Sequence, residues 1–181
     1  MSIDELKDRL PDHARDLRIN LGVIAGSTAL TPQQAWGTAI AAAATARNRE
    51  VATAIAADAS AHLSSDAIAA AQGAAAIMGM NNVYYRFLHM MGDGSEYAQL
   101  PARLRMQIIG KPGVEHLDFE LWCLAASAIT GCESCVRSHE QVVRERGGTR
   151  EQVQDAVRIA AVIHAVALTL EATPAAFSVA A

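Results

Sequence analysis

EHLDFELWCLAASAITGCESCVRSHEQVVRER, residues 115–146, is the stretch that decides the fold. Residues of high helix propensity stand on both sides of one glycine, Gly131, and glycine is the residue that most often follows the last turn of a helix. The stretch therefore predicts one helix over about 115–130 and a second over about 132–146. Neither half alternates between apolar and polar residues in the manner of a strand.

The remainder of the chain carries the same helical pattern. Thr31, which precedes a proline, and Thr149, which precedes Glu and Gln, are strong signals for a helix start. Alanine supplies most of the 51% hydrophobic content, whereas aromatic residues make up only 4%, and alanine favours helix over strand. We predict an all-α fold in a single domain, residues 1–181. The other expected helices cover residues 2–10, 12–25, 32–47, 50–62, 66–78 and the region after Thr149.

One short segment is echoed within the chain. AAIMGMNNV, residues 75–83, is similar to SAITGCESC, residues 127–135. Both predict an Ala-rich helix, a break at an Ile-x-Gly sequence and a new helix. This pattern is compatible with an old duplication of a helical unit, although chance similarity is easy in an Ala-rich chain.

Composition and charge exclude several classes of function. The net charge of −4, with mixed signs, argues against a nucleic-acid partner. The N-terminus, MSIDELKDRL, has acidic residues where a signal peptide needs a basic and then an apolar region. No uninterrupted run reaches the roughly 18 apolar residues of a membrane span, so we expect no membrane association. We expect a cytoplasmic protein, in which a close cysteine pair is more often catalytic or metal-binding than structural.

The C-x-x-C sequence at 132–135 is the strongest chemical signal. Cys132, Cys135 and His139 have the i, i+3, i+7 spacing that puts three side chains on one face of a helix. Gly131 suggests a helix start beside Cys132, where free N–H groups and the helix dipole favour a thiolate. The two sulfurs are close enough to form a disulfide, and His139 can accept a proton from the thiol of Cys135.

Two other interpretations stay open on the residues alone. Zinc would find three ligands in this motif, but a structural site needs a fourth, for which Cys123, His116 and His164 qualify only by residue type. Alternatively, the motif is two small apolar side chains and a satisfied histidine in a helix. Redox chemistry is favoured over both, and we expect no bound metal.

Glu120 and the methionines carry weaker signals. In a straight helix Glu120 lies roughly 18 Å from Cys132, so it reaches the cysteines only if the chain reverses at Gly131. On the residues alone, a polar-edge position for Glu120 is the simpler interpretation. The methionines in the middle of the chain are more typical of core or interface packing than of a cofactor site; they are Met78, Met80, Met90 and Met91.

The motif also resembles a known family. ELW (residues 120–122), an Ala/Ser-rich turn and then G-C-x-x-C-x-x-x-H (residues 131–139) resemble the alkylhydroperoxidase D family of the carboxymuconolactone decarboxylase-like superfamily. The likeness covers most of the chain. Three further segments look like alkylhydroperoxidase D proteins of the actinobacterial type: MSIDELKDRLPDHARDLRINL, QQAWGTAIAAAATARN and AAIMGMNNVYYR.

This resemblance implies an all-helical, commonly homotrimeric enzyme that reduces organic hydroperoxides without a bound cofactor. It implies that Cys135 attacks the peroxide and that Cys132 resolves the product into a redox disulfide. His139 and Glu120 match the proton relay of the family, so the resemblance also implies the chain reversal at Gly131.

The family also suggests partners for this chain. The implied reductant is dihydrolipoamide on a lipoyl-bearing acyltransferase, which dihydrolipoamide dehydrogenase keeps reduced. Electrons can also pass to the peroxiredoxin alkylhydroperoxidase C. One departure is Ser134, where members of the family often have a histidine. Two alternatives remain: a zinc-stabilised helical interaction module, and a thiol redox sensor of the same superfamily that does not turn over peroxide.

Overall fold

The computed structural model describes residues 1–92 and 94–172, and every regular element in these ranges is helical. The all-α prediction is therefore confirmed for the described part of the chain. Ten α-helices and two short 3₁₀ turns follow one another. In chain order they are α1 (Ile3–Asp8), η1 (Asp12–Ala14), α2 (Arg15–Asn20), α3 (Val23–Gly26), α4 (Pro32–Ala46), α5 (Arg49–Ala59), α6 (Ser65–Met91), η2 (Glu96–Gln99), α7 (Gln107–Gly110), α8 (His116–Thr130), α9 (Glu133–Glu145) and α10 (Arg150–Glu171).

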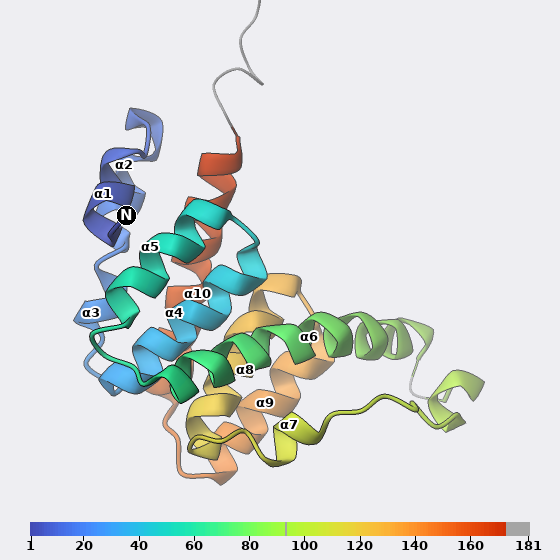
Figure 1. Ribbon diagram of the computed structural model, residues 1–181. Coiled ribbons are helices and arrows are strands. Elements are labelled where there is room, and N and C mark those ends of the chain that lie inside the picture. The colour runs from blue at the N-terminus through green and yellow to red at the C-terminus, as the bar shows by residue number, and fades with distance from the viewer. Residues whose placement is uncertain (93, 173–181) are drawn as a thin grey trace, which may run out of the picture.

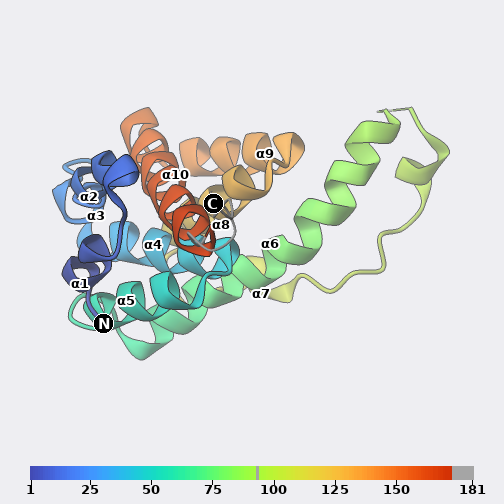
Figure 2. The ribbon, with the colours of Figure 1, turned by 90° about the horizontal axis from the view of Figure 1, so that it is seen from above.

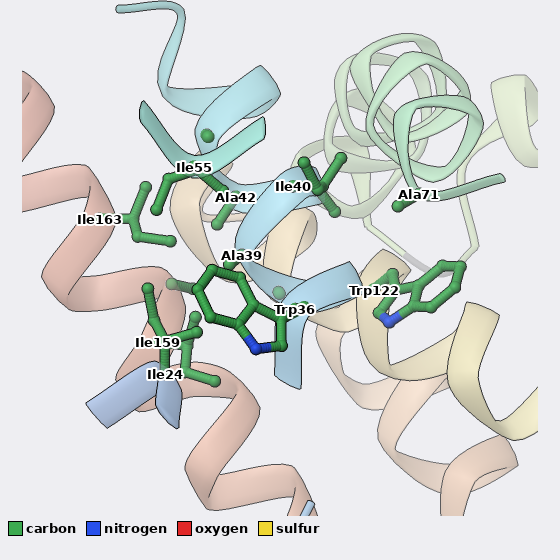
Figure 3. Close-up of a cluster of buried hydrophobic side chains, with 14 of the residues drawn as sticks. Ile24, Trp36, Ala39, Ile40, Ala42, Ile55, Ala71, Trp122, Ile159 and Ile163 are labelled. Atoms are coloured by element: carbon green, nitrogen blue, oxygen red, sulfur yellow. The ribbon is translucent and has the colours of Figure 1, made fainter. Parts of the chain in front are cut away.

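Helix α4 runs through the middle of the bundle, where α5, α6, α8 and α10 pack around it (Figure 1). Five of its alanines are buried and leave little side-chain bulk, so the neighbouring helices approach closely; they are Ala35, Ala39, Ala41, Ala42 and Ala43. Figure 3 shows this core, with side chains from α3, α5, α6, α8 and α10 gathered around the α4 residues.

Gly37 on α4 makes room for the largest core side chain of α8. A Cβ atom at this position would lie 2.2 Å from the indole ring of Trp122, so only glycine permits the contact. The indole Nε1–H donates to the carbonyl oxygen of Gln34 at 3.3 Å. Trp122 thereby packs directly against the backbone of α4.

Side-chain caps start the long helices and tie them together. Thr31 and Thr149 form capping boxes with Gln34 and Gln152, as their sequences predict. The Gln34 side chain also donates to Asp118 Oδ1 at 2.8 Å and accepts from Gln152 Nε2 at 3.1 Å. The first turns of α4, α8 and α10 are therefore joined in one polar network.

The chain reverses between α8 and α9 at Gly131. Gly131 has φ +69°, a left-handed conformation that glycine adopts readily. Its N–H donates to the carbonyl of Ala128 at 3.3 Å, and the N–H of Cys132 donates to Ser127 at 3.2 Å. These two bonds form a Schellman motif. The predicted helix break at Gly131 is confirmed, and the two helices lie side by side as a hairpin (Figure 1).

The corresponding break in the first copy of the echoed segment does not exist. Gly79 lies inside the continuous helix α6, so the prediction of a helix end there is wrong. Glycine in a helix interior costs about 0.5–1 kcal/mol relative to alanine, and the hydrogen bonds of Asn82, just beyond it, to Thr130 and Ser127 on α8 oppose that cost. Residues 12–25, predicted as one helix, also form three shorter elements, because they bury few side chains to stabilise a long one.

The second half of α6 leaves the bundle and forms an arm with η2 and the segment that leads to α7 (Figure 2). Apolar side chains are exposed along this arm, among them Val83, Phe87, Met90 and Tyr97. Met78, nearer the start of α6, is instead buried in the core. Met78 thus has the core role expected for the methionines, whereas Met90 and Met91 are exposed on the arm.

Among the described residues, α10 is the one helix that is long and apolar enough to cross a membrane, with an 18-residue window of mean hydropathy 1.5. Because the sequence contains no uninterrupted apolar run of this length, it did not predict α10 as a candidate membrane span. Core helices of globular proteins pass the same test, and α10 packs along both α4 and α8. Ile159, Ile163 and Val166 on this helix are completely buried.

The two echoed glycines provide a matched pair of variants. Gly131→Ala should lower the free energy of unfolding by about 1–2 kcal/mol, because an L-residue is strained at positive φ. Gly79→Ala should instead raise it by about 0.5–1 kcal/mol, because its methyl group meets no atom within 4 Å. Denaturant unfolding of both proteins measures the difference. Equal stability of the two variants would contradict the assignment of the helix end.

Candidate active site

The hairpin of α8 and α9 brings together a carboxylate and an imidazole that are 19 residues apart in sequence. His139 Nδ1 lies 2.6 Å from Glu120 Oε2, and both side chains are buried. Glu120 therefore reaches the centre of the site, and the polar-edge interpretation of it is wrong. A buried carboxylate needs such a partner, because an unpaired charge away from water is strongly disfavoured.

The other ring nitrogen of His139 contacts α6. Its Nε2 lies 3.1 Å from Met78 Sδ, and a thioether sulfur is a weak hydrogen-bond acceptor. When both ring nitrogens donate, to Glu120 and to Met78, the ring is an imidazolium, the form that has accepted a proton. The two contacts hold the ring of His139 from opposite sides.

Cys132 and Cys135 are joined by a disulfide, with their Cα atoms 5.3 Å apart. Cys132 is the residue that precedes the first turn of α9, and Cys135 lies within that turn. The predicted helix start and the proximity of the two sulfurs are both confirmed. Ser134 lies beside the pair, with its Oγ 3.6 Å from Cys132 Sγ.

The two cysteines differ in their surroundings. Cys132 is completely buried, whereas Cys135 lines a cavity of about 280 Å³ together with Glu120 and His139. A small molecule in this cavity would reach Cys135 rather than Cys132. This asymmetry agrees with the order of attack that the family resemblance implies.

The cavity lining is mixed. Its polar members include Glu120, His139 and, from α6, Asn81. Its apolar members come from α6, from α9 and from the region of α7, namely Tyr85, Met106, Ile109 and Val142. Such a cavity suits a molecule with one polar group on an apolar body.

Helix α6 also fixes the end of α8 beside the cysteines. Asn82 Nδ2 donates to Thr130 Oγ1 at 2.6 Å and its Oδ1 accepts from Ser127 Oγ at 3.1 Å. Arg86 Nη1 donates to the carbonyl oxygen of Thr130 at 2.8 Å. The sequence analysis missed these contributions of α6. The available signal was two asparagines in the middle of an otherwise apolar helix.

The other candidates from the sequence lie outside this arrangement. Cys123 is buried, and this burial, followed by the nearby charge of Glu120, raises the pKa of its thiol well above the ordinary value. His116 contacts the carbonyl of Ile109 at 2.9 Å, and His164 is exposed on α10. Within residues 1–92 and 94–172, no three His, Cys, Asp or Glu side chains form a group that could hold a metal ion.

Comparison with known proteins agrees with this geometry. Residues 95–177 match the family model described as the carboxymuconolactone decarboxylase family. The chain is also similar to proteins named alkyl hydroperoxide reductase AhpD. It is 58% identical to that of Gluconacetobacter diazotrophicus, over 97% of this chain and 96% of the relative. It is 57% identical to that of Rhodospirillum centenum, over 97% and 94% of the two chains.

The similarity extends to a third genus. The protein of that name from Streptomyces griseus is 52% identical, over 95% of this chain and 97% of the relative. Such identity over nearly the whole length of both chains leaves one conclusion: the chain belongs to the alkyl hydroperoxide reductase AhpD family.

Proposed function

We propose that the protein is an antioxidant enzyme that reduces organic hydroperoxides with the Cys132–Cys135 pair. One observation carries the proposal: Cys135 opens onto a mainly apolar cavity that a buried Glu–His pair also lines. The names of the relatives supply independent support.

The first chemical step is attack of the Cys135 thiolate on the terminal oxygen of the hydroperoxide. His139 accepts the thiol proton, and Glu120 stabilises the imidazolium that forms. An S–O bond forms and the O–O bond breaks, so Cys135 becomes a sulfenic acid and the alcohol leaves. Cys132 then attacks the sulfenic sulfur, which releases water and closes the disulfide.

The disulfide is returned to the dithiol by thiol–disulfide exchange. We assign this step to the dihydrolipoyl group of a lipoyl-bearing acyltransferase, which dihydrolipoamide dehydrogenase re-reduces. A dithiol reductant suits a cysteine pair, because its second sulfur displaces the mixed disulfide intramolecularly. In this scheme the pair can also pass electrons to alkylhydroperoxidase C, and no cofactor stays bound to the protein.

Self-association is part of the proposal. The arm formed by α6 and η2 exposes Phe87, Met90, Tyr97 and Leu100 to solvent. Apolar side chains gathered on a projecting element are typical of an interface between subunits. We propose that this arm contributes to a homotrimer.

A steady-state assay with dihydrolipoamide and tert-butyl hydroperoxide tests the reaction. The wild-type protein should consume peroxide, whereas Cys135→Ser and Cys132→Ser should each lose turnover, because one removes the nucleophile and the other prevents the disulfide. Cys123→Ala is the control and should retain activity. Full activity of Cys135→Ser would refute the assignment. A pair that is oxidised once and does not cycle would identify a redox sensor.

The relay is tested by Glu120→Gln, which keeps the shape of the side chain and removes its charge. Turnover should fall by about 100- to 10,000-fold, the usual contribution of a general acid or base. Glu140→Gln, on the same helix as His139 but outside the cavity lining, should leave turnover unchanged. Thermal unfolding of each variant shows whether the fold survives. Normal rates in Glu120→Gln would remove the relay from the mechanism.

The oligomeric state is tested by light scattering of the eluting native protein. A homotrimer has three times the chain mass of 19.1 kDa. Met90→Asp, which places a charge on the exposed face of the arm, should shift the population towards smaller species while each chain stays folded. A wild-type protein that elutes at the mass of one chain at micromolar concentration would contradict the trimer.

A further inference from the structure

Asn81 on α6 is buried at the active-site cavity without a partner for its amide oxygen. Only 5% of the residue is exposed, yet it lines the same cavity as Cys135. Among the described residues, its Oδ1 is buried and has no hydrogen-bond partner. Asn81 stands three residues after Met78, so the same face of α6 that holds His139 also presents this amide to the cavity.

Such a group is unfavourable unless something in the cavity binds it. Buried polar atoms are nearly always hydrogen-bonded, and an unpartnered one lowers stability. A leucine, which has the same branched shape, would occupy the position without an unpartnered polar atom. Among the described residues, the three other buried unpartnered side-chain atoms belong to Arg18, Glu50 and Ser95, which do not line this cavity. Asn81 therefore combines an unmet hydrogen bond with a place in the lining of the cavity that a substrate would fill.

We propose that Asn81 binds the –O–OH group of the hydroperoxide; this inference rests on the proposed function. A primary amide presents an acceptor and a donor side by side. Its Oδ1 accepts from the terminal O–H, and its Nδ2–H donates to the oxygen that carries the organic group. The terminal oxygen is thereby directed to Cys135, while the organic group lies against Tyr85, Ile109 and Val142.

The amide donor also faces the atom on which charge develops. As the S–O bond forms and the O–O bond breaks, the electron pair of the O–O bond remains on the oxygen of the leaving alkoxide. A donor placed at this oxygen binds the transition state more tightly than the ground state. The proton that completes the alcohol comes from the relay through His139, because Asn81 is neutral and keeps its protons.

The test is Asn81→Leu, which removes donor and acceptor and keeps the branched shape and the number of non-hydrogen atoms. The reduced protein is mixed with tert-butyl hydroperoxide, and the second-order rate constant of disulfide formation is measured by rapid quench and alkylation. This rate constant should fall by about 10- to 100-fold, the loss expected for a hydrogen bond to a group that gains charge. The Tm should rise, because the buried unpartnered amide is gone.

Two readouts separate substrate binding from a structural role. Alkylation of the reduced protein by iodoacetamide reports the thiolate of Cys135, and reduction of the disulfide by dihydrolipoamide reports the exchange step. Both rates should be unchanged in Asn81→Leu. An unchanged peroxide rate would overturn the inference, and so would a loss of alkylation rate equal to the loss of peroxide rate.

A second substrate, hydrogen peroxide, and a variant of the apolar lining, Val142→Ala, test the inference further. Hydrogen peroxide shares the O–OH group, so Asn81→Leu should slow its reaction as well. Val142→Ala should slow only the reaction with tert-butyl hydroperoxide. If Asn81→Leu slows only the reaction with tert-butyl hydroperoxide, while Val142→Ala slows the reactions with both peroxides, the inference is overturned. A different result would refute the proposed function itself: a wild-type cysteine pair that reacts with tert-butyl hydroperoxide no faster than a free thiol. The inference, which rests on that function, would then be refuted as well.

Discussion

The left-handed turn at Gly131 is the constraint on which the rest of the site depends. It ends α8 and folds α9 back along it, so that Glu120 meets His139 across the hairpin. The same turn leaves Cys132 at the start of α9, one helical turn before Cys135. One backbone conformation thus brings together the Glu120–His139 pair and the cysteine pair. Helix α6 secures this turn through its hydrogen bonds to the end of α8.

Two features of the site lower the stability of the folded protein. A buried carboxylate–imidazole pair loses hydration that its hydrogen bond only partly replaces. Asn81 leaves an amide oxygen without a partner among the described residues. Cys123, by contrast, is a buried thiol whose raised pKa keeps it protonated and unreactive. Chemistry is thus confined to the sulfurs that sit at the helix start and the cavity.

Local signals explain which features the sequence could predict. The ends of α8 and the starts of α4 and α10 depend on a glycine and on capping threonines, and these were predicted within a few residues. Gly79 has nearly the same neighbours as Gly131, yet its helix continues, because packing beyond it decides the outcome. The contact of Glu120 with His139 came from the family resemblance, since sequence spacing alone favoured a polar edge. Asn81 has no local signature, because its role depends on a space enclosed by three other helical segments.

Gly37 fixes the position of α8 along the axis of α4. The indole of Trp122 sits against α4 at the one place where that helix has no side chain, and Trp122 lies two residues beyond Glu120 on α8. Helix α8 therefore cannot shift along α4 without breaking the contact between the indole of Trp122 and the backbone at Gly37. Gly37, a residue without a side chain on a different helix, thus helps to set the axial position of the Glu120 carboxylate.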